Sequence, residues 1–328
     1  MKNYPYTATR VKAMESLLLS REDYIKMRKM GLNEMIRFLE EREYKREIDL
    51  LSAEHRGMEL INLALNQNLS NTINKLIEIS TKESQVLIQD YSMKWVINNI
   101  KILLRTDEWG LAKSAIVPVA PTTYKYCINL LLAKKEKKDE FIKQVCRIAG
   151  LKENFRNLYE SSDIISMENE LDKSYYLRLL GIYRTLESGI LKNFYRFLVE
   201  LTDIRNIIKL KSMNVPDETI KNLVTTNSGF VGTLVKSDME NSIKLIKESK
   251  YSSFADGVED DLSNLENNIE KYLLQYSFKL MRLKPLSIAP IFGYLLAKEI
   301  EIRNLRLLIN STAVGLEDEF VEKNLIVG

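Results

Sequence analysis

The stretch EIRNLRLLIN, residues 301–310, has two counterparts earlier in the chain: VINNIKILLR at residues 96–105 and DIRNIIKLKS at residues 203–212. Each is built around one asparagine, and the three are Asn99, Asn206 and Asn304. Apolar residues stand two places before, one place after and four places after each asparagine, and these offsets fall on one face of an α-helix. The positions two places before are Ile97, Ile204 and Ile302. The pattern predicts three long helices that bury the same stripe.

A second set of matching positions supports a threefold repeat. The segment 39–44, with an apolar residue, Glu and Tyr at set places, matches the segment 246–251. The middle counterpart, residues 158–163, ends in Asp163 where the others have tyrosine. In each of the three parts of the chain, this segment precedes the asparagine stretch in the same order. We therefore expect three helical repeats, at residues 1–116, 117–215 and 216–328.

Most of the remaining chain also shows helical spacing of apolar residues, and alternation with a period of two is nearly absent. Ser20 followed by Asp23 predicts a capping box at a helix start. Pro118 and Pro121 exclude a continuous helix through residues 116–121, and Pro216 predicts the start of a new helix. These features predict an all-α fold without a sheet.

Composition and charge exclude several classes of protein. The chain has 328 residues, of which 45% are hydrophobic and 28% charged, so it can bury a sizeable core. The 48 basic and 45 acidic residues are interleaved, whereas a nucleic-acid binder concentrates basic charge on one face. Cys127 and Cys146 form no CxxC pair and are typical of reduced cysteines in a cytosolic protein. No apolar run reaches the length of about 20 residues that a membrane span needs.

Parts of the sequence resemble a known family. The stretch PLSIAPIFGYLLAKEIEIRNLRLLINSTAVGL, residues 285–316, resembles the C subunit of bacterial and archaeal V-type ATPases, which is related to the d subunit of the eukaryotic vacuolar enzyme. YTATRVKAMESLLL at residues 6–19 and Leu103-Leu104-Arg105 also fit. The middle repeat departs from the pattern at Asp163 and at Ile208, where the other asparagine helices carry Lys101 and Arg306.

The resemblance implies a funnel-like protein of three similar helical domains around a pseudo-threefold axis. It implies a non-catalytic central-stalk subunit, one copy per complex, on the cytoplasmic side of the membrane. Its partners would be the shaft subunits of the catalytic head and the membrane-embedded rotor ring. The protein would transmit torque between ATP chemistry and ion transport. Proton and sodium transport, and both ATP synthesis and hydrolysis, stay open at this point.

The sequence shows no site for chemistry of its own. It lacks a Walker loop, GxGxxG, HExxH and GxSxG, so we expect no catalytic, cofactor-binding or metal-ligating residues and no small-molecule substrate. His55, the single histidine, lies in a polar stretch and is expected to face solvent. The basic run Lys134–Lys138 is more typical of a solvated connection than of a site for phospholipid headgroups. For Asn99, Asn206 and Asn304 we expect structural roles, each tying its helix to an adjoining turn or helix.

A helical-repeat scaffold that binds another protein or RNA in a concave surface is the alternative to the ATPase subunit. An enzyme of the helical-bundle type would need clustered histidine and acidic ligands, which the sequence lacks.

Overall fold

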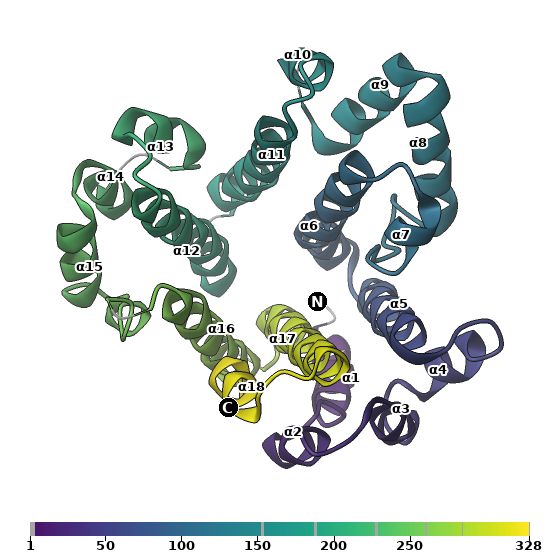
Figure 1. Ribbon diagram of the computed structural model, residues 1–328. Coiled ribbons are helices and arrows are strands. Elements are labelled where there is room, and N and C mark those ends of the chain that lie inside the picture. The colour runs from purple at the N-terminus through teal and green to yellow at the C-terminus, as the bar shows by residue number, and fades with distance from the viewer. Residues whose placement is uncertain are drawn as a thin grey trace. The chain divides into compact units, whose positions relative to one another are not determined.

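The computed structural model describes residues 4–151, 154–186, 189–226, 229–259, 261–283 and 285–327. Within these ranges the chain forms eighteen α-helices and one 3-10 helix, and no strand occurs among them (Figure 1). The predicted all-α fold is confirmed. The described chain separates into two compact units, residues 1–171 with 277–328, and residues 172–276. The arrangement of three similar domains around a pseudo-threefold axis, with its boundaries after residues 116 and 215, stays a prediction.

The first unit contains the N-terminal helices and the C-terminal ones. Its helices are α1 (Tyr4–Glu15), α2 (Arg21–Met27), α3 (Leu32–Glu40), α4 (Lys45–Leu51), α5 (Gly57–Glu78), α6 (Lys82–Arg105), α7 (Trp109–Lys113), α8 (Tyr124–Glu136), α9 (Lys138–Ala149), α10 (Asn154–Glu160), α17 (Ala289–Val314) and α18 (Asp318–Asn324). Two helices continue from this unit into the other: α11 (Ile164–Thr185) and α16 (Ser263–Leu283). The second unit also holds α12 (Ile190–Ser212), α13 (Asp217–Leu223), α14 (Gly229–Lys236), α15 (Met239–Lys247) and the 3-10 helix η1 (Ser252–Phe254).

Several helix ends follow from the local sequence. The Ser20–Asp23 capping box is present at the start of α2, as predicted. The hydroxyl of Thr81 caps α6 in a similar way. Residues 116–121 are not helical, and Pro216 immediately precedes α13, so both predictions from proline are confirmed.

Helix α17 is the central element of the first unit. It packs against α1, α3, α5 and α18, so segments from both ends of the sequence lie side by side (Figure 1). Its residues are buried on nearly all sides, including Phe292, Tyr294 and Leu305. A helix that is apolar around most of its circumference is typical of a core position.

Gly293 permits a close approach between α16 and α17. A Cβ atom at this position would lie 2.6 Å from the carbonyl oxygen of Ser277 and 2.7 Å from Cγ of Met281. These distances are shorter than any normal carbon contact, so a side chain here would force the two helices apart. The position therefore requires glycine because of backbone proximity.

The second unit has its own hydrophobic core. Ile204, Ile207 and Ile208 of α12 are fully buried and pack with apolar side chains of α13, α14, α15 and α16. Aromatic rings extend this core, with Phe197 packed against Tyr272 and Tyr276. A contiguous hydrophobic core of this kind is typical of a compact unit.

Candidate functional site

The positions predicted from the repeats lie on three long helices, Asn99 on α6, Asn206 on α12 and Asn304 on α17. Asn99 and Asn304 are buried, whereas Asn206 is half-buried. The paired isoleucines are all buried, and they are Ile97, Ile204 and Ile302.

Asn99 and Asn304 make the same pair of hydrogen bonds. The Asn99 amide donates to the carbonyl of Val117 at 2.6 Å and accepts from the Val117 N–H at 3.1 Å. The Asn304 amide donates to the carbonyl of Ile326 at 2.6 Å and accepts from the Ile326 N–H at 3.0 Å. In each case a side chain in mid-helix satisfies both backbone groups of a residue in a later non-helical segment. These groups are buried, so they need such partners.

On α12 the side chain with comparable bonds is Asp203, three residues before Asn206. Its carboxylate accepts from the backbone N–H of Thr225 at 2.8 Å and of Thr226 at 2.9 Å. The Thr226 hydroxyl donates to the same carboxylate at 2.7 Å. Burial raises the pKa of the Asp203 carboxyl, although these hydrogen bonds act in the opposite direction. The equivalence of Asn206 with the other two asparagines stays a prediction, and sequence reasoning did not single out Asp203.

The three helices are followed by the same succession of elements. After α6, α12 and α17 come three or four residues and then the short helices α7, α13 and α18. The chain that follows each short helix returns to the preceding long helix. There its backbone forms hydrogen bonds with the side chain of Asn99, Asp203 or Asn304. Each buried polar side chain therefore fixes the return segment that follows its own helix.

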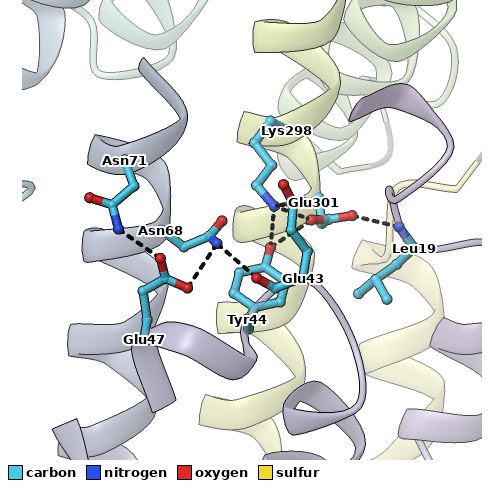
Figure 2. A network of polar contacts seen from close by, with 8 residues as sticks. All are labelled: Leu19, Glu43, Tyr44, Glu47, Asn68, Asn71, Lys298 and Glu301. Atoms are coloured by element: carbon cyan, nitrogen blue, oxygen red, sulfur yellow. Dashed lines mark hydrogen bonds and ion pairs between the residues drawn. The ribbon is translucent and has the colours of Figure 1, made fainter. Parts of the chain in front are cut away.

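A buried ionic cluster lies on α17, where Lys298 and Glu301 precede Asn304 by six and three residues. The ammonium of Lys298 is 2.8 Å from a carboxylate oxygen of Glu301 and 2.9 Å from one of Glu43. It also donates to the hydroxyl of Tyr44 at 3.0 Å, and Figure 2 shows these groups converging on the Lys298 nitrogen. Lys298 has no exposed surface, so its charge is balanced entirely within the protein.

The cluster connects segments that are far apart in sequence. Glu301 accepts from the Tyr44 hydroxyl at 2.6 Å and from the backbone N–H of Leu19 at 2.6 Å. Asn68 on α5 donates to the carbonyl of Glu43 at 3.3 Å (Figure 2). These bonds hold the loops before α2 and α4, together with α5, against α17.

The protonation states of the cluster do not suit acid–base chemistry. Burial by itself disfavours the ammonium, yet the carboxylates of Glu301 and Glu43 raise the pKa of Lys298 above its ordinary value. Burial and the charge of Glu301 raise the pKa of Tyr44 well above its ordinary value. At neutral pH Lys298 is therefore an ammonium and Tyr44 a neutral phenol, and neither can serve as a base. The arrangement acts as a structural connection.

Other polar residues of α17 also bind neighbouring segments. Glu299 binds Lys94, whose ammonium lies 4.2 Å from the ring centroid of Tyr91. Arg303 donates to the carbonyl of Asn324 at 3.0 Å, and Arg306 donates to Asn66 of α5. The stretch KEIEIRNLR, residues 298–306, thus joins α17 to several neighbouring segments of the unit.

The amino-acid sequence is similar to those of known proteins. The family model described as ATP synthase (C/AC39) subunit matches residues 7–324. The chain belongs to this family. It is similar to the C subunit of the A-type ATP synthase of Methanococcoides burtonii, with 30% identity over 99% of this chain and 94% of that protein. It is also similar to the corresponding protein of Methanosarcina mazei, with 30% identity and coverage of 99% and 93%, and to that of Haloferax volcanii, with 26% identity and coverage of 99% and 98%.

In this ATP synthase (C/AC39) subunit, the stretch that suggested the family has a clear structural position. Residues 285–316 include the whole of α17, with the Lys298 cluster and Asn304. Sequence reasoning found this stretch but not its partners Glu43 and Tyr44. They lie about 255 residues away and carry no local signal of the pairing.

Two further observations concern other kinds of site in this family member. Among the described residues, no group of three or more His, Cys, Asp and Glu side chains could hold a metal ion, and no helix is long and apolar enough to cross a membrane.

The prediction for His55 is wrong: its side chain is only 11% exposed, and it lies between α4 and α5. The imidazole is 3.0 Å from a carboxylate oxygen of Glu59 and 3.1 Å from the Lys113 ammonium, and these contacts cover it.

Proposed function

We propose that this chain is the non-catalytic central-stalk subunit of a rotary A/V-type ATPase. It joins the shaft of the catalytic head to the membrane-embedded rotor ring and transmits torque between ATP chemistry and ion transport. The observation that carries the proposal is the family match over residues 7–324, together with relatives, named as C subunits of A-type ATP synthases, that align over nearly the whole chain.

The chemistry of the described residues is consistent with a mechanical role. A protein that transmits torque must resist deformation, and the Lys298 cluster ties three segments of the first unit to one helix. The strongly held ionisable groups bind one another, which leaves them unsuited to a reaction. We accordingly propose that the chain is not an enzyme.

The proposal includes an organisation in three repeats, at residues 1–116, 117–215 and 216–328, around a pseudo-threefold axis. The recurrence of long helix, short helix and fixed return segment supports it. We further propose one copy per complex, in a peripheral position on the cytoplasmic side of the membrane. The absence of a membrane-spanning helix among the described residues is compatible with this position.

The test is deletion of this chain in a cell that assembles the complete complex. Membranes are isolated, and two quantities are measured: the amount of catalytic head that sediments with the membrane sector, and the ion transport driven by ATP. We expect the head to detach and the remaining ATP hydrolysis to drive no transport, with both restored by the wild-type chain. If head and membrane sector remain joined and coupled without it, the proposal is wrong.

A further inference from the structure

A pocket with a mostly apolar lining lies between α1 and the residues around the end of α16 and the start of α17. We call it the α1 pocket, and its volume is about 380 Å³. Both sides contribute apolar residues to its lining, among them Ala8, Val11, Ala13, Met281, Pro285 and Pro290. All of these residues belong to the first compact unit. The pocket is therefore formed within one unit.

The walls of the α1 pocket are held in place by packing and hydrogen bonding. α1 packs along α17, and the Thr7 hydroxyl donates to the carbonyl of Ile79, just after α5, at 2.7 Å. α16 lies close against α17 at Gly293. A pocket with fixed walls is favourable for binding, because little conformational freedom is lost when a partner fills it.

The α1 pocket is long enough for more than one side chain. The residues that line it on α1 extend from Ala8 to Glu15, which corresponds to about 10 Å of helix at about 1.5 Å per residue. Side chains four residues apart on a helix have Cβ atoms about 5–6 Å apart, so two of them fit along this length. A helix that presents two apolar side chains on one face matches these dimensions.

The segments that form the α1 pocket carry an excess of positive charge. Residues 271–298 contain no acidic residue. Lys279 and Arg282 of this stretch are exposed, and so is Arg10 of α1. The one carboxylate of α1, that of Glu15, is paired with Lys12 at 2.7 Å. This excess of exposed cations favours an occupant with negative charge.

Large apolar side chains border the pocket. Leu286, which lines it, is 65% exposed, and Leu283 at the end of α16 is 54% exposed. Single exposed apolar residues are common on protein surfaces, but these two adjoin an apolar pocket and extend the area that a partner can cover. A lipid surface would contact only the protruding side chains. The recessed lining is reached by side chains of a protein partner.

We propose that the α1 pocket is a docking site for a helix of a protein partner, and that this helix carries two apolar side chains four residues apart with acidic residues beside them. The apolar pair enters the pocket, and the acidic residues pair with Arg10, Lys279 and Arg282. The site follows from the pocket and the charges around it, so it does not depend on the proposed function.

The test uses the full chain and two synthetic peptides of about 20 residues, a length at which an isolated helix can form. Both peptides carry the same pair of leucines four residues apart. Glutamate occupies the flanking positions in the acidic peptide, and lysine occupies them in the basic peptide. Binding is measured by the fluorescence anisotropy of labelled peptide. We expect the acidic peptide to bind at least about tenfold more tightly than the basic peptide.

A substitution inside the pocket shows whether the peptide enters it. Ala13→Phe places a large side chain in the pocket from an exposed position of α1. It should weaken binding of the acidic peptide at least about tenfold. Ala313→Phe is the matched control, because Ala313 is also exposed on a helix of the same unit and does not line the pocket. It should bind the acidic peptide as wild type does.

A double charge reversal tests the selection by charge. Lys279→Glu with Arg282→Glu should weaken binding of the acidic peptide and strengthen binding of the basic one. Lys125→Glu with Lys143→Glu is the control, because it changes the net charge equally at exposed positions of α8 and α9. It should leave the preference for the acidic peptide unchanged. Thermal unfolding verifies that all variants remain folded.

Three results would overturn the inference. If neither peptide binds, or if both bind equally, the pocket does not select an acidic helix. If Ala13→Phe binds the acidic peptide as wild type does, the peptide does not occupy the pocket. If vesicles of anionic phospholipid bind wild type and Ala13→Phe abolishes that binding, the surface contacts lipid instead of a helix. The proposed function is tested separately by deletion of the chain, so it stands whichever of these results is found.

Discussion

Lys298 and Glu301 form an ion pair of 2.8 Å on one face of α17, and their side chains are 0% and 3% exposed. Both charged groups are shielded from water. The loss of their hydration is compensated by their contact with each other and by hydrogen bonds with Glu43 and Tyr44. Such a pair contributes less to net stability than its short distance suggests, since two desolvation costs oppose the attraction. Substitution of only one member of the pair, however, leaves the other charge buried without its partner.

Lys298→Met should therefore destabilise the protein strongly. The substitution leaves the carboxylate of Glu301 in the core without its cation, and breaking a buried pair in this way costs about 3–5 kcal/mol. The measurement is urea unfolding followed by circular dichroism.

Lys12→Met is the matched control, because Lys12 binds Glu15 at the same spacing of three residues but is 71% exposed. It should change stability by less than about 0.5 kcal/mol. Adding Glu301→Gln to Lys298→Met should recover part of the loss. Equal effects of the two lysine substitutions would show that the Lys298 pair is not buried as described.

Alanine substitutions can decide which residue of α12 corresponds to Asn304. Asn304→Ala leaves the N–H and carbonyl of Ile326 without their partner and should cost about 1–3 kcal/mol. Asp203→Ala should cost a similar amount, since it removes the acceptor of Thr225 and Thr226. Asn206→Ala, at a half-buried position, should stay within about 0.5 kcal/mol of wild type. A large loss of stability for Asn206→Ala with a small loss for Asp203→Ala would show instead that Asn206 is the residue that corresponds to Asn304.

The behaviour of this helix illustrates what the sequence could predict. The apolar stripe of α12 was visible because helical spacing places Ile204 and Ile207 on one face. The polar position was harder to assign, because a shift of three residues keeps nearly the same face. Leu201, Ile204 and Ile207 around Asp203 fit the pattern about as well as Ile204, Ile207 and Leu210 around Asn206. Only the fold shows which polar side chain meets the return segment.

The buried cluster was beyond sequence reasoning for a different reason. A lysine and a glutamate three residues apart on a helix are most often a solvated pair. The partners Glu43 and Tyr44 meet Lys298 because the chain brings the loop before α4 against α17. Pairings across 255 residues depend on topology, and no local pattern encodes them. The prediction for His55 failed for the same reason, since Lys113 covers it from another helix.

Gly293→Ala should separate α16 from α17. The new Cβ would lie 2.6 Å from a backbone oxygen of Ser277, which cannot rotate away. Overpacking of this kind typically costs about 1–3 kcal/mol, more than the gain from alanine's helix propensity.

Gly181→Ala on α11 provides the control, because no atom lies within 4 Å of a Cβ there. It should leave stability unchanged or raise it by up to about 1 kcal/mol. Thermal unfolding of both variants is the measurement. A Gly293→Ala protein as stable as wild type would mean that the two helices are not in the close contact described.

The last prediction concerns how the stability of the second unit depends on pH. The pKa of Asp203 is raised in the folded protein, so the native state binds more protons than the unfolded state at and above the ordinary aspartate range of about 4. The Asp203 contribution to the free energy of unfolding therefore falls as pH rises through that window. Asp203→Asn stays neutral and removes this dependence. The stability of the variant relative to wild type should rise between about pH 4 and about pH 7.

Asp238→Asn is a control of opposite sign in the same unit. Hydrogen bonds from the backbone and side chain of Asn241 lower the pKa of the Asp238 carboxyl, so its contribution is present at higher pH and is lost as pH falls through its folded pKa. The stability of this variant relative to wild type should fall as pH rises, because asparagine cannot supply the charge. Urea midpoints measured at half-unit steps of pH give both difference curves. Two curves of the same slope would contradict a raised pKa of Asp203, in which the effect of burial outweighs the hydrogen bonds from Thr225 and Thr226.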